Sequence, residues 1–184
     1  MSRVALSRDH ETAASDAAPR VSAAARLRNA FPSIRAAFVG SALWAAAMMA
    51  SALFALHADG WQTAAKAREI AALYLAGALI AFVPALWLGR LLSAGGKREA
   101  AFAALFLSLG VMTIGLTATI YALDYRSYYT EWHAPAFSLT WAFQFVFTVA
   151  GALYQFAVLG LRLYLPFGLL ALFAAALWFA RLPR

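Results

Sequence analysis

The sequence contains no cysteine and few charged residues. Only 12% of its residues are charged and 64% are hydrophobic, whereas soluble domains are about 25% charged and about half apolar. The absence of cysteine excludes disulfide bonds, thiolate metal sites and cysteine nucleophiles. A chain of 184 residues is too short to bury so large an apolar fraction in one soluble core. We therefore expect an integral membrane protein that is surrounded by lipid.

Long apolar runs separated by short polar segments predict an all-α, polytopic helical membrane protein. A hydrocarbon core of about 30 Å needs about 20 apolar residues per helix. The last apolar run, residues 138–180, contains a single charge, Arg162, and would be about 64 Å long as one helix, so we expect it to fold back between Gly160 and Pro166. The prediction is five transmembrane helices, with four helices plus a re-entrant or interfacial segment as the alternative. The predicted spans are about 36–56, 70–89, 100–123, 138–161 and 165–181.

Residues 1–33 are predicted to be a disordered, basic, cytoplasmic tail, and residues 34–184 to be the transmembrane bundle. The tail is rich in alanine and serine and has no long apolar run, so it cannot offset the entropy that ordering would cost. Its last part, residues 20–35, has apolar residues at helical spacing between arginines. A short helix on an anionic membrane surface is therefore an alternative for that part.

The distribution of lysine and arginine predicts the orientation. With five spans and a cytoplasmic N-terminus, ten of these residues lie inside and five outside, which agrees with the positive-inside rule. Arg181 and Arg184 would then lie outside, whereas four spans would place them inside. The net charge of +7 is concentrated at membrane boundaries, so it does not indicate nucleic-acid binding. Composition and short loops suggest a bacterial inner (cytoplasmic) membrane.

The fourth span carries the most regular polar pattern. Its small and polar residues recur on one face of a helix, at Thr140, Gln144, Thr148, Gly151, Gln155 and Arg162. An amide that faced lipid would be unsatisfied, so this polar stripe must face another helix or a cavity. The third span has a matching stripe at Gly110, Thr113, Thr117, Tyr121 and Asp124. We predict that the two stripes pack together; a partner-docking face and a ligand or ion path are the alternatives.

The segment after the third span concentrates aromatic and ionisable residues. Its tyrosines and Trp132 are typical of a membrane boundary. The alternative is a divalent-metal site formed on the outer face by the weak candidates His57, Asp59, Asp124, Glu131 and His133. Because no spacing among these residues is diagnostic, we predict neither a metal nor a cofactor.

The predicted spans contain no Asp, Glu, Lys or His, the groups that proton-coupled transport and acid–base catalysis usually need. We therefore expect a non-enzymatic accessory or scaffold subunit whose partners are the lipid bilayer and another membrane protein or a second copy. The alternative is a small transporter, channel or ligand-binding sensor that uses the polar stripe of the fourth span. A metal-dependent enzyme is a third hypothesis and requires His57 and His133 to come together.

Overall fold

A computed structural model describes residues 23–60 and 63–182 of the chain. Every regular element within them is helical, as the predicted all-α class requires. The chain divides into two units, residues 1–30 and residues 31–184. In the first unit, Ala23–Asn29 forms the short helix α2, and the rest of the tail, up to residue 22, lies outside the described residues. The helices discussed below belong to the second unit.

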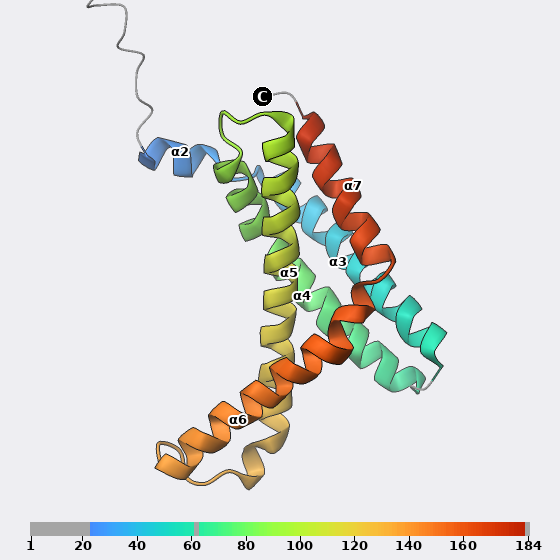
Figure 1. Cartoon of the computed structure of the whole chain (residues 1–184), viewed down its shortest axis with the longest axis vertical. Helices are drawn as coiled ribbons and strands as arrows, with labels where there is room; N and C mark the ends of the chain where they lie inside the picture. The colour runs from blue at the N-terminus through green and yellow to red at the C-terminus, as the bar shows by residue number, and fades with distance from the viewer. Residues whose placement is uncertain (1–22, 61–62, 183–184) are drawn as a thin grey trace, which may run out of the picture. The chain divides into compact units, whose positions relative to one another are not determined.

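Five α-helices make up the second unit (Figure 1): α3 (Ile34–Asp59), α4 (Ala64–Leu92), α5 (Arg98–Tyr129), α6 (Leu139–Gln155) and α7 (Phe167–Arg181). Three of them begin at a hydroxyl residue, Ser33, Thr63 or Ser138, whose side chain accepts a hydrogen bond from a backbone amide of the first turn. Gly60 ends α3 in the left-handed conformation, with φ of 66°, as glycine often does at this position.

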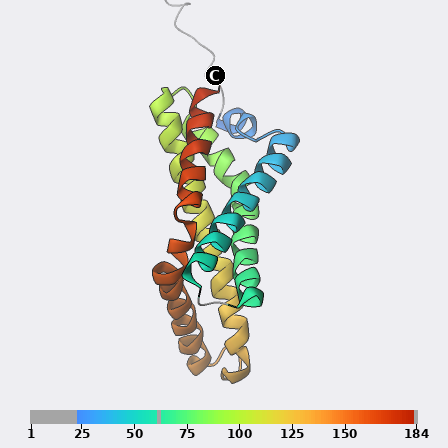
Figure 2. The same cartoon turned by 90° about the vertical axis from the view of Figure 1, so that its right-hand side faces the viewer.

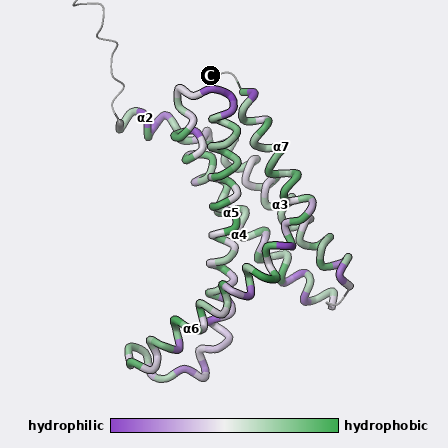
Figure 3. Tube along the Cα trace, viewed as in Figure 1, coloured by the Kyte–Doolittle hydropathy of each residue, from purple (hydrophilic) through white to green (hydrophobic). Residues whose placement is uncertain are grey.

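Four helical stretches of the described residues are long and apolar enough to cross a membrane: 34–59, 64–92, 98–132 and 139–164. Helix α7 is also apolar but has only 15 residues, and Figure 3 shows its high hydropathy along most of its length. These helices support the predicted class, a polytopic helical membrane protein.

Helices α3, α4 and α5 pack through small and hydroxyl side chains. A Cβ atom on Gly77 of α4 would lie 2.7 Å from the Cα of Thr117 on α5, so only glycine allows this approach. The Ser108 hydroxyl of α5 donates to the Ala85 carbonyl of α4 at 3.0 Å. Close backbone approach of this kind is how helices associate in lipid, where burial of apolar surface gives little driving force.

Helices α6 and α7 both run antiparallel to α5 and contact different halves of it. Tyr121, in the second half of α5, donates a hydrogen bond to Gln155 at the end of α6. Phe102, near the start of α5, packs edge-on against Phe173 of α7, with ring centroids 5.1 Å apart. Figures 1 and 2 show α6 beside the end of α5 and α7 beside its beginning. The fold-back predicted between residues 160 and 166 is therefore wrong, because the chain continues in the same direction.

The junction between α6 and α7 bends without reversing because earlier helices supply its missing hydrogen bonds. It consists of a π-helical turn, η2 (Phe156–Gly160), and a 3₁₀ turn, η3 (Leu161–Tyr164), whose carbonyls need donors outside the α-helical pattern. The Tyr74 hydroxyl donates to the Gly160 carbonyl at 2.6 Å. The Ser51 hydroxyl donates to the Leu163 carbonyl and accepts from the Gly168 amide. A tight turn is therefore not needed where α6 ends.

This path places the end of α7 at the same end of the second unit as the start of α3 (Figure 1). We call the opposite end, where α3 ends and α4 begins, the distal end. The last turns of α5 and most of α6 extend past the distal end in both Figure 1 and Figure 2. The 3₁₀ turn η1 (Thr130–Trp132) follows α5 there.

Candidate functional site

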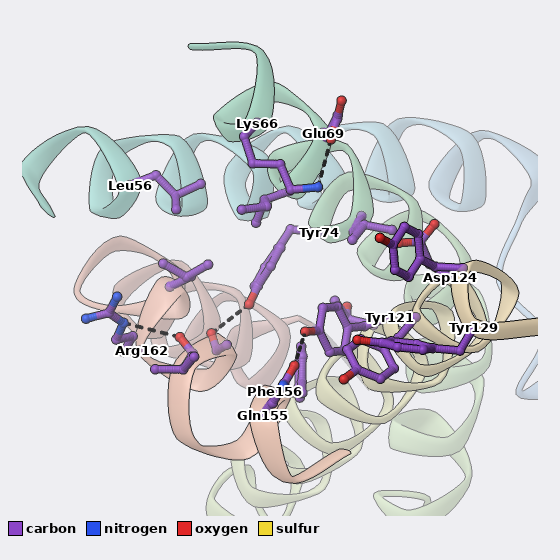
Figure 4. A pocket seen from close by; sticks show the side chains of 18 residues that line it. Leu56, Lys66, Glu69, Tyr74, Tyr121, Asp124, Tyr129, Gln155, Phe156 and Arg162 are labelled. Atoms are coloured by element: carbon purple, nitrogen blue, oxygen red, sulfur yellow. Dashed lines mark hydrogen bonds and ion pairs between the residues drawn. The ribbon is translucent and has the colours of Figure 1, made fainter. Parts of the chain in front are cut away.

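A cavity of about 590 Å³ lies near the distal end, between α3, α4, α5 and the junction of α6 with α7 (Figure 4). Most of its lining is apolar, and the aliphatic and phenylalanine side chains come from α3, α4 and the junction of α6 with α7: Leu56, Ile70, Leu73, Phe156, Leu159 and Leu163. A concave, mainly apolar pocket of this size with a few converging polar groups is the usual form of a small-molecule site.

Tyrosines of α5 form one wall of the cavity. Tyr121, Tyr125, Tyr128 and Tyr129 all line it, because steps of three and four residues keep side chains on one face of a helix. The ring centroids of Tyr125 and Tyr129 are 4.9 Å apart, and those of Tyr128 and Tyr129 are 5.1 Å apart. The Tyr121 hydroxyl donates to Gln155 Oε1 at 2.9 Å, so this wall is joined to the end of α6. We refer to these four residues as the tyrosine wall.

Charged side chains surround the mouth of the cavity, and two ion pairs hold most of them. Lys66 Nζ lies 3.0 Å from Glu69 Oε2 on α4. Arg162 of η3 lies 2.9 Å from Asp59 Oδ2 at the end of α3. Among the described residues, the carboxylate of Asp124 has no hydrogen-bond or ion-pair partner. Figure 4 shows Asp124 beside Tyr121 and Tyr129, away from Arg162.

The π-helical turn η2 supplies the floor opposite the tyrosine wall. Phe156, Leu159 and Gly160 line the cavity there, and Tyr74 of α4 reaches Gly160 from across it (Figure 4). A Cβ atom on Gly160 would lie 2.7 Å from the Phe156 ring and 3.0 Å from the Tyr74 hydroxyl, so the site needs glycine. Single π-helical turns inside membrane or soluble helices often mark functional sites.

The polar stripe of α6 faces inward, and its residues find partners within the chain. Gln144 Oε1 accepts a hydrogen bond from the Ala134 amide at 2.8 Å, and Thr148 Oγ1 lies 3.3 Å from His133 Nε2. The stripe therefore holds the loop after α5 against α6. Thr140 is exposed and Gly151 is half-buried. Of this stripe, Gln155 and the more distant Arg162 line the cavity.

The stripe of α5 divides between four neighbours instead of packing wholly on α6, and its first member, Gly110, faces Leu172 of α7. Thr113 accepts a hydrogen bond from Trp44 Nε1 of α3 at 3.0 Å, and Thr117 packs against Gly77 of α4. Tyr121 is the member that bonds to α6. The two predicted stripes therefore meet at Tyr121 and Gln155, whereas Thr117 lies against α4 because Gly77 allows the two backbones to approach there.

The five weak metal candidates do not come together. The described residues contain no group of three histidine, cysteine or acidic side chains close enough to hold a metal ion. Asp59 pairs with Arg162, and His133 lies against Thr148. His57, Asp124 and Glu131 are exposed.

Sequence reasoning missed Tyr74, assigned Tyr125, Tyr128 and Tyr129 to a membrane boundary, and placed Tyr121 in the polar stripe of the third span. A signal was present for Tyr74, because it lies inside the apolar run at 70–89 and a buried tyrosine hydroxyl usually finds a hydrogen-bond partner. No local pattern could have identified that partner as Gly160, since 86 residues separate the two.

Comparison with protein-family models, with curated proteins and with solved structures finds no match to this chain. The functional argument therefore depends on the geometry of the cavity and its surroundings.

Proposed function

We propose that this chain is an integral membrane protein that binds a small molecule in the cavity at its distal end, as a sensor or a small transporter. The observation that carries the proposal is the cavity of about 590 Å³, which several helices of the chain line together and which combines apolar walls with a few polar side chains. Sites with these properties hold drug-sized ligands in many proteins. The proposed role is non-enzymatic.

The hydrogen bonds of the polar stripe support a role for it inside the chain. Gln144 and Gln155 each accept a hydrogen bond through Oε1, and Thr148 Oγ1 contacts His133 Nε2. Gln155 also contributes to the cavity.

We further propose a cytoplasmic N-terminus in a bacterial inner membrane, with the distal end facing outward. Because α6 and α7 run in the same direction along α5, both ends of the second unit's helical path lie on one side. Eleven lysines and arginines then fall inside and four outside, namely Lys66, Arg68, Arg126 and Arg162. This difference supports the orientation more strongly than the count for five spans does.

Native mass spectrometry of the protein purified in mild detergent tests the proposal. The variant Leu73→Trp fills the cavity, because Leu73 lines it. Leu79→Trp is the matched control, since Leu79 lies on the same helix but is exposed at 43% and does not line the cavity. We expect a bound small molecule in the wild type and in Leu79→Trp, and its loss from Leu73→Trp. Identical bound species in all three proteins would contradict the proposal.

A second candidate function, that of an accessory subunit, is favoured by the position and surface of α6. Helix α6 extends past the distal end, and only 11% of the most apolar 18-residue window of the 139–164 stretch is buried, against 39% of the corresponding window in each of the other three stretches. Its outward side chains are large and apolar: Leu139, Phe143, Val146, Phe147 and Tyr154. A helix of 26 residues such as α3 already spans about 39 Å, more than the hydrocarbon core of about 30 Å. The part of α6 that extends beyond that length carries an apolar face, which contact with another membrane protein would cover.

A photo-crosslinking amino acid placed at Phe147 tests this second candidate. Leu107, which is exposed at 62% on the first half of α5, is the control position. A protein adduct from position 147 in native membranes, with lipid adducts alone from position 107, would support the accessory role. Lipid adducts alone from both positions would contradict it.

A further inference from the structure

We propose that the cavity selects an amphipathic organic cation, whose positive group lies at Asp124 and the tyrosine wall and whose apolar part lies against α3, α4 and η2. This inference names the ligand class for the proposed small-molecule site and rests on that proposed function. It follows from the charges at the mouth, from the aromatic surface beside Asp124, and from the apolar walls opposite.

The charges at the mouth favour a cation. Each of the two cationic side chains is paired with its own carboxylate, Lys66 with Glu69 and Arg162 with Asp59. Asp124 adds a fifth charge that no cation neutralises by contact. Counted together with Asp59, which pairs with Arg162 but does not itself line the cavity, these five side chains carry a net charge of −1. The chain as a whole carries +7, so this mouth departs in sign from the rest of the protein. An anion would have to break an existing ion pair to find a partner here.

The tyrosine wall provides the second contact that a positive group needs. Tyr125 and Tyr129 lie within 4.9 Å of each other, centroid to centroid, and both line the cavity with Asp124. The face of an aromatic ring attracts ammonium and related cations, and the attraction grows when water is excluded. Asp124 precedes Tyr125 and lies one helical turn before Tyr128, so the carboxylate and the rings share one face of α5.

The remaining walls are suited to an apolar body and offer few competing polar groups. Leu73, Leu159 and Phe156 face the cavity from α4 and η2. The hydroxyls of Tyr74 and Tyr121 are already engaged, with the Gly160 carbonyl and with Gln155. A ligand with one positive group and an apolar remainder matches this division, whereas a sugar or a nucleotide would leave many of its polar groups without partners.

Two probe ions of matched size and opposite charge test the inference: tetraphenylphosphonium and tetraphenylborate. Binding of each radiolabelled ion is measured by scintillation proximity on immobilised full-length protein in an uncharged detergent. We expect saturable binding of tetraphenylphosphonium that tetraphenylborate does not displace. Asp124→Asn should weaken this binding about tenfold or more, since it removes the charged acceptor. Glu131→Gln, which neutralises an exposed carboxylate outside the lining, should leave it unchanged.

A second variant pair separates the aromatic contribution from the charge. Tyr125→Leu keeps an apolar side chain but removes the ring face, and should weaken tetraphenylphosphonium binding several-fold. Tyr154→Leu removes a tyrosine that is exposed at 70% on α6 and should have no effect. An elution volume in size-exclusion chromatography that matches the wild type shows that each variant is folded.

The outcomes distinguish this inference from the function on which it rests. The cation assignment is overturned if Asp124→Asn binds tetraphenylphosphonium as tightly as the wild type does. It is also overturned if tetraphenylborate binds more tightly than tetraphenylphosphonium and Leu73→Trp abolishes that binding. In both cases the ligand-binding cavity stands. If neither ion binds, the cation assignment is again overturned. The comparison of Leu73→Trp with Leu79→Trp by mass spectrometry then decides the proposed function independently.

Discussion

The Tyr74 hydroxyl of α4 donates a hydrogen bond of 2.6 Å to the carbonyl of Gly160, the last residue of the π-helical turn. This hydrogen bond joins α4 to the junction between α6 and α7. It also crosses the floor of the cavity, because both residues line it. The shape of the candidate site and the break between α6 and α7 therefore depend on the same contact.

Replacement of Tyr74 by phenylalanine should destabilise the protein. The change removes a buried hydrogen bond to the Gly160 carbonyl, which costs about 0.5–1.5 kcal/mol of unfolding free energy. Unfolding by sodium dodecyl sulfate in mixed micelles measures the loss. Tyr154→Phe, at a position exposed at 70%, is the control and should unfold as the wild type does. Equal stability of the two variants would show that the junction does not need this bond.

Replacement of Gly77 by alanine should weaken the packing of α4 on α5. The new Cβ atom would lie 2.7 Å from the Thr117 Cα, a backbone atom that cannot move aside alone, so we expect a loss of about 1–3 kcal/mol. Gly115→Ala is the matched control, because nothing lies within 4 Å of its Cβ position. That variant should be neutral or more stable by up to about 1 kcal/mol. The same unfolding assay compares them, and a neutral Gly77→Ala would refute the close approach.

The hydrogen bond between Trp44 and Thr113 should be detectable as a coupling energy. A double-mutant cycle with Trp44→Phe and Thr113→Val should give about 0.6–2 kcal/mol, as buried bonds between membrane helices do. A parallel cycle with Trp44→Phe and Thr119→Val should give none, since Thr119 is exposed and bonds to a carbonyl of its own helix. Similar coupling in both cycles would argue against the specific contact between α3 and α5.

Paired cysteines should distinguish the observed path of α6 and α7 from a hairpin. The sequence has no native cysteine, so no background needs to be removed. A bismaleimide should crosslink Gly110→Cys with Leu172→Cys, because a Cβ at Gly110 would lie 3.3 Å from Leu172. It should not crosslink Tyr154→Cys with Leu172→Cys, which a hairpin would bring together. Gel mobility after proteolysis between the sites reads out both pairs, and the reverse result would restore the hairpin.

Reporter fusions should place the two chain ends in one compartment. Green fluorescent protein fused before Met1 or after Arg184 should fluoresce, and alkaline phosphatase at the same positions should be inactive, if both ends are cytoplasmic. Alkaline phosphatase inserted after Pro135, in the loop between η1 and α6, should be active. Active phosphatase after Arg184 would require an additional crossing of the membrane.

Much of this fold follows from composition and periodicity, but the last quarter does not. The spans that became α3, α4 and α5 are predicted because each is an apolar run of about 20 residues or more between short polar segments. The chain from residue 138 to residue 180 offered a glycine, an arginine and a proline, which are as compatible with a bend as with a reversal. The bend is decided by Ser51 and Tyr74, which lie far away in sequence.

The candidate site was predictable only in part for a similar reason. The regular spacing of Gln144, Thr148 and Gln155 indicated that one face of α6 must meet polar partners, and those partners exist. Which partner each would find depends on the close contact of Gly77 with Thr117, which turns part of the stripe of α5 away from α6. Sequence periodicity gives the face of a helix and not the neighbour that faces it.

The junction between α6 and α7 also depends on helices that precede it in the chain. Its donors, Tyr74 and Ser51, belong to helices that are synthesised first, and its acceptors, Gly160 and Leu163, belong to the segment synthesised last. Helices α3 to α5 can form their own backbone hydrogen bonds before the ribosome has reached residue 160. The junction between α6 and α7 lacks the donors Tyr74 and Ser51 until it meets these helices. We therefore expect an ordered biogenesis, in which α3, α4 and α5 form first and the final segment acquires its shape by docking on them.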